Sequence, residues 1–128
     1  GHGVLSTAND KGEVDAAMFA SPRVLDDATV SFIMQDKLTH QNLQTNPYAA
    51  YLFIEHEPES GAKWDGKRLF LRKVGEEKDT DRLYALRRHS NERDGKVRYL
   101  VFFEVTKVLP LSGSGPRVKR ENSTPTAT

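Results

Sequence analysis

The sequence has no cysteine among its 128 residues. Disulfides, zinc sites built on thiolates and nucleophilic thiols are therefore excluded. No apolar run approaches the roughly 20 residues that a membrane-spanning helix needs, and no stretch has the pattern of a signal peptide. We therefore expect a cytoplasmic protein that has no membrane partner.

An excess of charge of one sign is also missing. The 19 basic and 18 acidic residues leave a net charge of +1, so no global field attracts nucleic acid. The basic residues Arg87-Arg88 and 117–120 have no aromatic side chains interleaved with them, and stacking on single-stranded nucleic acid depends on such side chains. We predict no nucleic-acid partner.

Residues that signal hydrolytic or metal chemistry are few. No serine sits at a sharp strand-to-helix turn, so a Ser-His-Asp triad is not expected. The glutamates at positions 55, 57 and 59 fit a solvated loop better than an acid–base pair. The histidines are scattered, and we predict no metal site from them: His2, His40, His56 and His89.

What the chain does have is the hydrophobic patterning of a small β protein. A chain of 128 residues fits one domain. Short apolar or alternating runs, joined by turns rather than by repeated helices, predict a closed or split barrel. The helix predicted over 80–89 has Leu83 and Leu86 at the spacing of a buried stripe. The predicted strands cover 4–8, 13–19, 28–35, 48–54, 67–74 and 97–111.

Two regions near the C-terminus affect domain organisation and assembly. The run from Tyr99 to Phe103 is apolar at every position, which predicts burial on both faces, by the barrel and by a helix or a partner subunit. Residues 112–128 are rich in Ser, Gly, Pro and Thr and lack the apolar side chains that a core needs. We predict one domain over 1–111 and a flexible tail over 112–128.

The most informative stretch runs from Lys37 to Ile54. Thr39 is predicted to cap a helix of about two turns with its hydroxyl, and Asn46-Pro47 ends that helix because the residue before proline avoids the helical region. A strand follows. The exposed helix N-terminus beside Lys37 offers N–H groups and partial positive charge, which suit a phosphate.

This stretch resembles the flavin-binding split β-barrels of the pyridoxamine 5′-phosphate oxidase-like superfamily. The resemblance depends on Leu-Thr-His-x-Asn-Leu at 38–43, followed by Asn-Pro-x-Ala-Ala-Tyr-Leu-Phe at 46–53, and it covers roughly residues 3 to 111 of the chain. It implies a mainly β (α+β) fold: a six-stranded split β-barrel with two short helices. It also implies FMN as cofactor and a homodimer that holds the flavin at its interface.

The resemblance implies which residues contact the cofactor. Many relatives have Arg or Lys where this chain has Leu38 and Thr39, so Arg23, Arg68 or Arg72 could supply the missing charge. Trp64 could cover the flavin ring or serve only as a packing anchor, and small side chains at 16–17 could let a flat ligand approach the backbone. The expected cofactor-binding residues are Ala16, Ala17, Met18, Lys37, Leu38, Thr39, His40, Asn42 and Trp64.

The expected function is a flavin-dependent oxidoreductase that acts on a small substrate or electron partner. No catalytic residue stands out, because the flavin itself carries the redox chemistry. The alternative is a non-catalytic module on the same barrel that carries or senses flavin, deazaflavin or haem. The sequence does not choose between the two.

Overall fold

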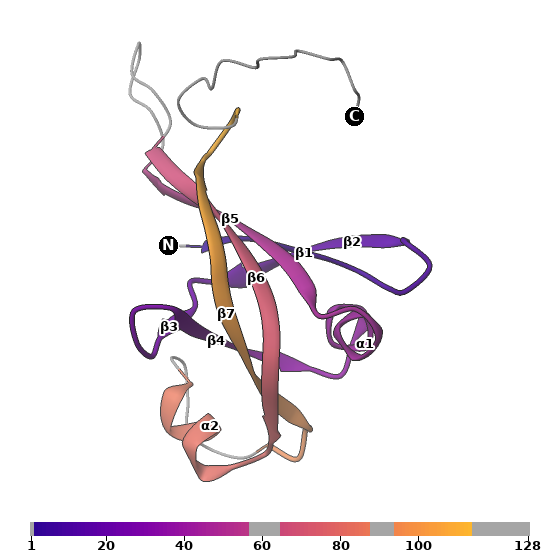
Figure 1. The fold of residues 1–128 in the computed structure, drawn as a ribbon. Helices are drawn as coiled ribbons and strands as arrows, with labels where there is room; N and C mark the ends of the chain where they lie inside the picture. The colour runs from indigo at the N-terminus through magenta and orange to yellow at the C-terminus, as the bar shows by residue number, and fades with distance from the viewer. Residues whose placement is uncertain (1, 57–64, 88–93, 114–128) are drawn as a thin grey trace.

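The computed structural model describes residues 2–56, 65–87 and 94–113, which form one antiparallel sheet and two short helices (Figure 1). The strand order in the sheet is β2-β1-β5-β6-β7-β4-β3. The elements in chain order are β1 (His2–Ala8), β2 (Val14–Ala20), β3 (Arg23–Val24), β4 (Thr29–Gln35), α1 (Leu38–Thr45), β5 (Tyr48–His56), β6 (Asp65–Lys78), α2 (Asp81–Leu86) and β7 (Arg98–Pro110).

The sheet curls until its two ends meet without pairing. Phe19 of β2 packs edge-to-face on Phe32 of β4, with ring centroids 5.9 Å apart. These strands lie near opposite ends of the sheet order and share no hydrogen-bonded ladder in the described residues. The predicted α+β split barrel is therefore confirmed. We call the line where β2 meets β4 the seam.

The predicted number of strands was wrong, because the sheet has seven strands and not six. The additional strand is β3, in which Arg23 pairs with Ser31 and Val24 pairs with Val30. It lies between the predicted strands 13–19 and 28–35, where no strand was expected. A two-residue strand is too short to show alternation, so only its pairing with β4 reveals it.

Alternation along the strands produces the core. Leu5, Tyr51 and Phe103 are fully buried inside the curled sheet, and burying one such side chain contributes about 1.5–3 kcal/mol. The Tyr51 hydroxyl donates to the Phe19 carbonyl across 2.9 Å. This bond ties β5 to β2 and helps to fix the position of the seam.

Helix α2 covers the outer face of the sheet near β4 and β7 (Figure 1). Leu83 of α2 and Leu100 of β7 are both fully buried in this second cluster, with Phe102 packed against them. Val101 and Phe103 belong to the inner core instead. The prediction that β7 is buried on both faces is confirmed, and a helix of the same chain provides the outer cover. Thr80 caps the N-terminus of α2, because its hydroxyl accepts a hydrogen bond from the Leu83 N–H.

Strand β6 runs further than predicted. The strand predicted over 67–74 continues through Lys78, with an irregularity in register between Lys73 and Gly75. Glu76 finds charged and polar partners there, which the sequence pattern does not show.

Two further predictions, the C-terminal tail and the role of Trp64, concern residues largely outside the described part of the chain. The sheet ends at Pro110, and most of the predicted tail, 114–128, lies outside the described residues, as does Trp64. In the described part of the chain, neither helix has the length and apolar character needed to cross a membrane.

Candidate functional site at the seam

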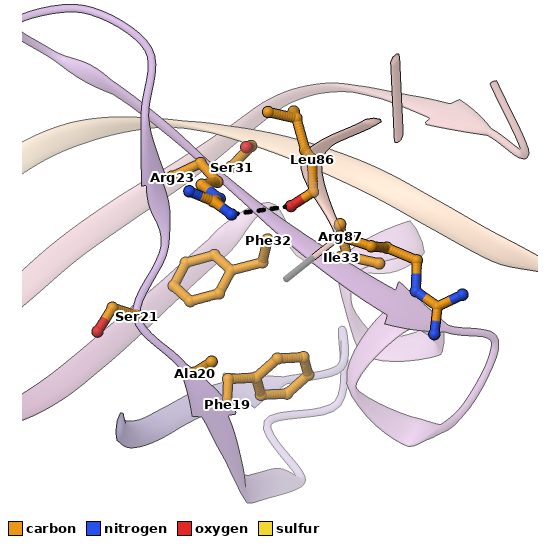
Figure 2. A pocket seen from close by; sticks show the side chains of 9 residues that line it. All are labelled: Phe19, Ala20, Ser21, Arg23, Ser31, Phe32, Ile33, Leu86 and Arg87. Carbon is orange, nitrogen blue, oxygen red and sulfur yellow. Dashed lines mark hydrogen bonds between the residues drawn. The ribbon is translucent and has the colours of Figure 1, made fainter. Parts of the chain in front are cut away.

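Two cavities open along the seam. One, of about 240 Å³, lies at the start of α1 and is lined by Lys37 and Thr39 among others. The other, of about 170 Å³, lies between the β2–β3 connection and the end of α2 (Figure 2). Phe19 and Ile33 line both cavities. The two cavities are therefore neighbours along the seam. We refer to the pair as the elongated hollow, with the α1 cavity at one end and the α2 cavity at the other.

The α1 cavity contains a helix N-terminus with a cation beside it. Lys37 is the N-cap residue in extended conformation, and no side chain caps the helix. The first intrahelical bond runs from the Gln41 N–H to the Lys37 carbonyl, so the N–H groups of residues 38–40 precede it. Lys37 is exposed and makes no ion pair within the described residues. Such a terminus attracts an anionic group.

Thr39 does not cap the helix, so that prediction was wrong. It is the second helical residue, its side chain is buried, and its hydroxyl donates to Asp15 Oδ2 of β2 across 3.1 Å. The physical reason is that a side chain already within the helix cannot reach back to the N–H groups that an N-cap residue serves. The end of the helix is as predicted: Asn46 is its C-cap, directly before Pro47.

Arg98 lines the α1 cavity, and sequence reasoning missed it. Its guanidinium makes a two-pronged ion pair with Asp94, at 2.6 and 2.9 Å. Hydrogen bonds from Arg98 hold the pKa of Asp94 well below its usual range, and the same bonds raise the pKa of Arg98. No motif marks Arg98, which reaches the cavity only because it pairs with Gln35 across β4 and β7.

The three arginines predicted as possible phosphate partners lie elsewhere. Arg68 donates to the carbonyls of Pro110 and Gly113. Arg72 is paired with Glu104 at 3.1 Å. Arg23 lines the α2 cavity rather than the α1 cavity.

His40 belongs to α1, is buried, and fastens this helix to the sheet. Its Nδ1 lies 2.7 Å from Asp36 Oδ1, its Nε2 lies 3.0 Å from Glu76 Oε1, and its ring stacks on Tyr99 with centroids 3.8 Å apart. Burial pushes the pKa of Glu76 upward, but hydrogen bonds from Lys73, Gln44 and His40 outweigh it and hold that pKa below its ordinary value. Both ring nitrogens of His40 are therefore engaged within the chain.

Asn42 is also buried and ties α1 to β1, because its amide donates to the Thr7 hydroxyl across 3.1 Å. Like His40, it contacts other parts of the chain. Neither residue lines either cavity. Their predicted contact with a cofactor stays a prediction, whereas their role in holding α1 is visible in the structure.

The remaining predicted residues divide by strand face. Alternation puts Ala17 on the same face of β2 as Asp15 and Phe19, toward the seam. Ala16 and Met18 lie on the opposite, exposed face, where Met18 is 68% exposed. Leu38 is half-exposed at the start of α1. Their part in cofactor binding stays a prediction, as does that of Trp64.

The α2 cavity combines aromatic walls with two unsatisfied donors (Figure 2). The Ser31 hydroxyl and Arg23 Nε are buried and have no hydrogen-bond partner in the described structure. Arg23 Nη2 donates to the Leu86 carbonyl across 3.2 Å, which joins β3 to the end of α2. Phe19 and Phe32 form the aromatic part of the lining.

No model of a protein family and no curated protein matches the chain, but solved structures do. An FMN-binding protein from Syntrophomonas wolfei has a TM-score of 0.68 and 20% identity, covering 86% of this chain and 76% of its own. A candidate pyridoxamine 5′-phosphate oxidase from Lactobacillus delbrueckii has a TM-score of 0.59 and 15% identity, covering 84% and 83%. The haem storage protein HutZ from Vibrio cholerae has a TM-score of 0.54 and 17% identity, covering 85% and 84%.

These similarities extend over most of each chain. The chain therefore has the split-barrel fold of these proteins, and the resemblance to pyridoxamine 5′-phosphate oxidase-like proteins is confirmed for the fold. Proteins with this fold bind different cofactors, because the group named is FMN in one relative and haem in another. Fold alone does not select the ligand.

Proposed function

We propose that the chain binds FMN along the seam and acts as a flavin-dependent oxidoreductase. The observation that carries the proposal is the elongated hollow itself. At one end it has a helix N-terminus and Lys37, a cation without an ion pair among the described residues, and it continues past the apolar side chains of Phe19 and Ile33. A flavin mononucleotide has the matching order of groups, a dianionic phosphate followed by a flat ring.

The residues present fit this group. Lys37 and the N–H groups of residues 38–40 would hold the phosphate, since charge and helix dipole act in the same direction there. Ala17 would let the ligand pass close to β2, and Phe19 and Ile33 would shield the ring from water. Two features oppose the phosphate: the carboxylate of Asp15 lies near the helix start, and Arg98 is already paired with Asp94. Lys37 therefore has the main electrostatic role.

When bound, the flavin would supply the redox chemistry. The residues of this chain would bind it, orient it and exclude water. The described residues that line the two cavities include no histidine and no carboxylate, so we assign no general acid or base to them. We propose that an external electron donor reduces the flavin with little help from side chains.

Three further parts of the proposal concern assembly and context. The protein is proposed to be a cytoplasmic homodimer, with the flavin between subunits and with Ala16, Met18 and Trp64 available to it there. Residues 112–128 are proposed to be a tail that is dispensable for binding, because their composition cannot build a core. The substrate is a small molecule or an electron partner.

The rival function is a non-catalytic carrier or sensor, and the similarity to a haem storage protein favours it. His40 is poorly placed as a haem ligand, because both of its nitrogens are engaged by Asp36 and Glu76. A haem on this barrel would need another axial ligand. This observation supports the proposal of flavin rather than haem.

The absorption spectrum of the purified protein tests the proposal. We expect the two bands of a bound flavin, released on denaturation as FMN, and oxidation of reduced nicotinamide by the flavin-loaded protein. A Soret band without flavin would overturn FMN in favour of haem. If the protein contains flavin but oxidises no electron donor, the oxidoreductase function is refuted and the carrier function is supported.

A further inference from the structure

We infer that the α2 cavity is a binding subsite for a small planar carboxylate, held by Ser31 and Arg23. Both residues belong to the described cavity lining, and they are direct cross-strand partners on β4 and β3. The subsite lies at the other end of the seam from Lys37 and Thr39.

The first argument is the unsatisfied polar pair. Ser31 is 1% exposed, and its hydroxyl has no partner in the described structure. Arg23 Nε is buried and also lacks a partner, while Nη2 of the same guanidinium is held by the Leu86 carbonyl. Buried donors without acceptors cost free energy and are rare in folded proteins. Two such donors side by side indicate that an acceptor binds between them.

The second argument is charge. Arg23 makes no ion pair with any carboxylate in the described residues, and none of the side chains that line this cavity is acidic. Arg23 is half-buried, and a cation partly removed from water without a counter-ion favours an anionic ligand. The planar guanidinium with a hydroxyl beside it suits the two oxygens of a carboxylate.

The third argument is shape. Phe19 and Phe32 lie edge-to-face at 84° and form the apolar lining below the polar pair (Figure 2). A cavity of about 170 Å³ admits a small ring with one substituent. Aromatic walls prefer a planar, apolar body, which would contact them by stacking or edge contacts. Together these features select a small aromatic or conjugated acid.

The position suggests what the acid does, and only this step rests on the proposed function. Phe19 and Ile33 border both cavities, so a ligand in the α2 cavity would adjoin a flavin that lies along the seam. The carboxylate would then anchor the substrate that exchanges electrons with the flavin. Binding of the acid itself does not depend on that cofactor.

The test is a titration of the full chain with benzoate, followed by isothermal calorimetry and by amide shifts of residues 31–33 in NMR spectra. We expect saturable binding that moves these amides, and no such binding of benzyl alcohol, which lacks the carboxylate. Arg23→Gln and Ser31→Ala should each weaken benzoate by about tenfold or more, since each removes a hydrogen bond to a charged group.

The matched control is Arg87→Gln. Arg87 lines the same cavity and carries the same charge, but its guanidinium points away from Arg23 (Figure 2), so benzoate binding should change less than twofold. Ser31→Ala also offers a stability readout: it removes a buried unsatisfied hydroxyl, so the melting temperature without ligand should hold or rise. A merely structural serine would lower it.

Absence of benzoate binding at millimolar concentration, or equal affinity in wild type and Arg23→Gln, would overturn the subsite. These measurements use protein without added flavin. A failure of FMN to bind would therefore leave them unaffected, and the two proposals can fail separately. If FMN does bind, benzoate should perturb its absorption spectrum in wild type and not in Arg23→Gln.

Discussion

The Thr39 hydroxyl donates to the Asp15 carboxylate across 3.1 Å and so fastens the first turn of α1 to β2. This bond puts a negative charge close to the N–H groups proposed to hold the cofactor phosphate. Asp15 thus positions the helix, and it also opposes a dianion electrostatically. The two effects can be separated by substitution.

We expect Asp15→Asn to bind FMN more tightly than wild type. The amide oxygen can still accept from Thr39, whereas the charge is gone, and removing one partly exposed like charge is worth up to about 1 kcal/mol. FMN should gain up to about fivefold in affinity, measured by quenching of flavin fluorescence. Riboflavin, which lacks the phosphate, serves as the control and should not change. Weaker FMN binding would show that the carboxylate itself supports the site.

Lys37→Ala should weaken FMN by about tenfold to a hundredfold, since a hydrogen bond to a charged group is worth roughly 1.5–3 kcal/mol. The same titration with riboflavin should show almost no effect. Equal loss for both ligands would mean that Lys37 acts away from the phosphate. Thr39→Ser should be nearly silent, because serine keeps the hydroxyl that Asp15 accepts from.

The ion cluster around Glu76 should make stability depend on pH. Its pKa is lowered in the folded protein, so ionised Glu76 stabilises the fold above its ordinary pKa of 4.5. That contribution is lost as pH falls through the lower folded pKa. The melting temperature of wild type should exceed that of Glu76→Gln at about pH 6, and the gap should narrow by about pH 3. A constant gap across this range would exclude the ionised carboxylate as its cause.

Local signals in the sequence predicted the elements well. Asn46-Pro47 ends α1 as expected, and Gly12, between the predicted strands 4–8 and 13–19, has a positive φ of +81° that glycine adopts easily in a tight turn. Each of these depends only on residues close in the chain. The two-residue strand β3 could not be predicted from such local signals, because only its pairing with Val30 and Ser31 defines it as a strand.

The candidate site was less predictable because its contacts are distant in sequence. Thr39 is a good N-cap by type, but the chain begins α1 at Leu38, and the hydroxyl meets Asp15, 24 positions away. Arg98 reaches the α1 cavity through the register of β7 against β4. Ser31 and Arg23 carry no distinctive local pattern, and they come together only because β3 pairs with β4. No local sequence pattern predicts these long-range contacts.

Helix α2 should be firmly docked on the sheet. Leu83 is fully buried against Leu100 and Phe102, so Leu83→Ala should cost about 2–5 kcal/mol of unfolding free energy, measured by urea denaturation. Leu38→Ala is the control: Leu38 is 53% exposed, and a surface change of this kind usually stays within about 0.5 kcal/mol. Similar small effects for both would mean that α2 is not packed on β7 in solution.

The final prediction concerns the homodimer. Because α2 covers the outer face of β7, that strand no longer requires a partner subunit. The outer face of β2 offers a different reason to expect a dimer, since Val14 and Met18 are 81% and 68% exposed there, and exposed apolar patches mark interaction sites.

Light scattering at micromolar concentration should give a mass of twice 14.4 kDa for the dimer. Met18→Lys should shift the mass toward the monomer without unfolding the barrel, because the side chain already lies in solvent. Val24→Lys, at the other end of the sheet order, should leave the dimer intact. A wild-type chain that is monomeric at this concentration would refute the dimer. If Met18→Lys remains dimeric, the interface does not lie on the outer face of β2.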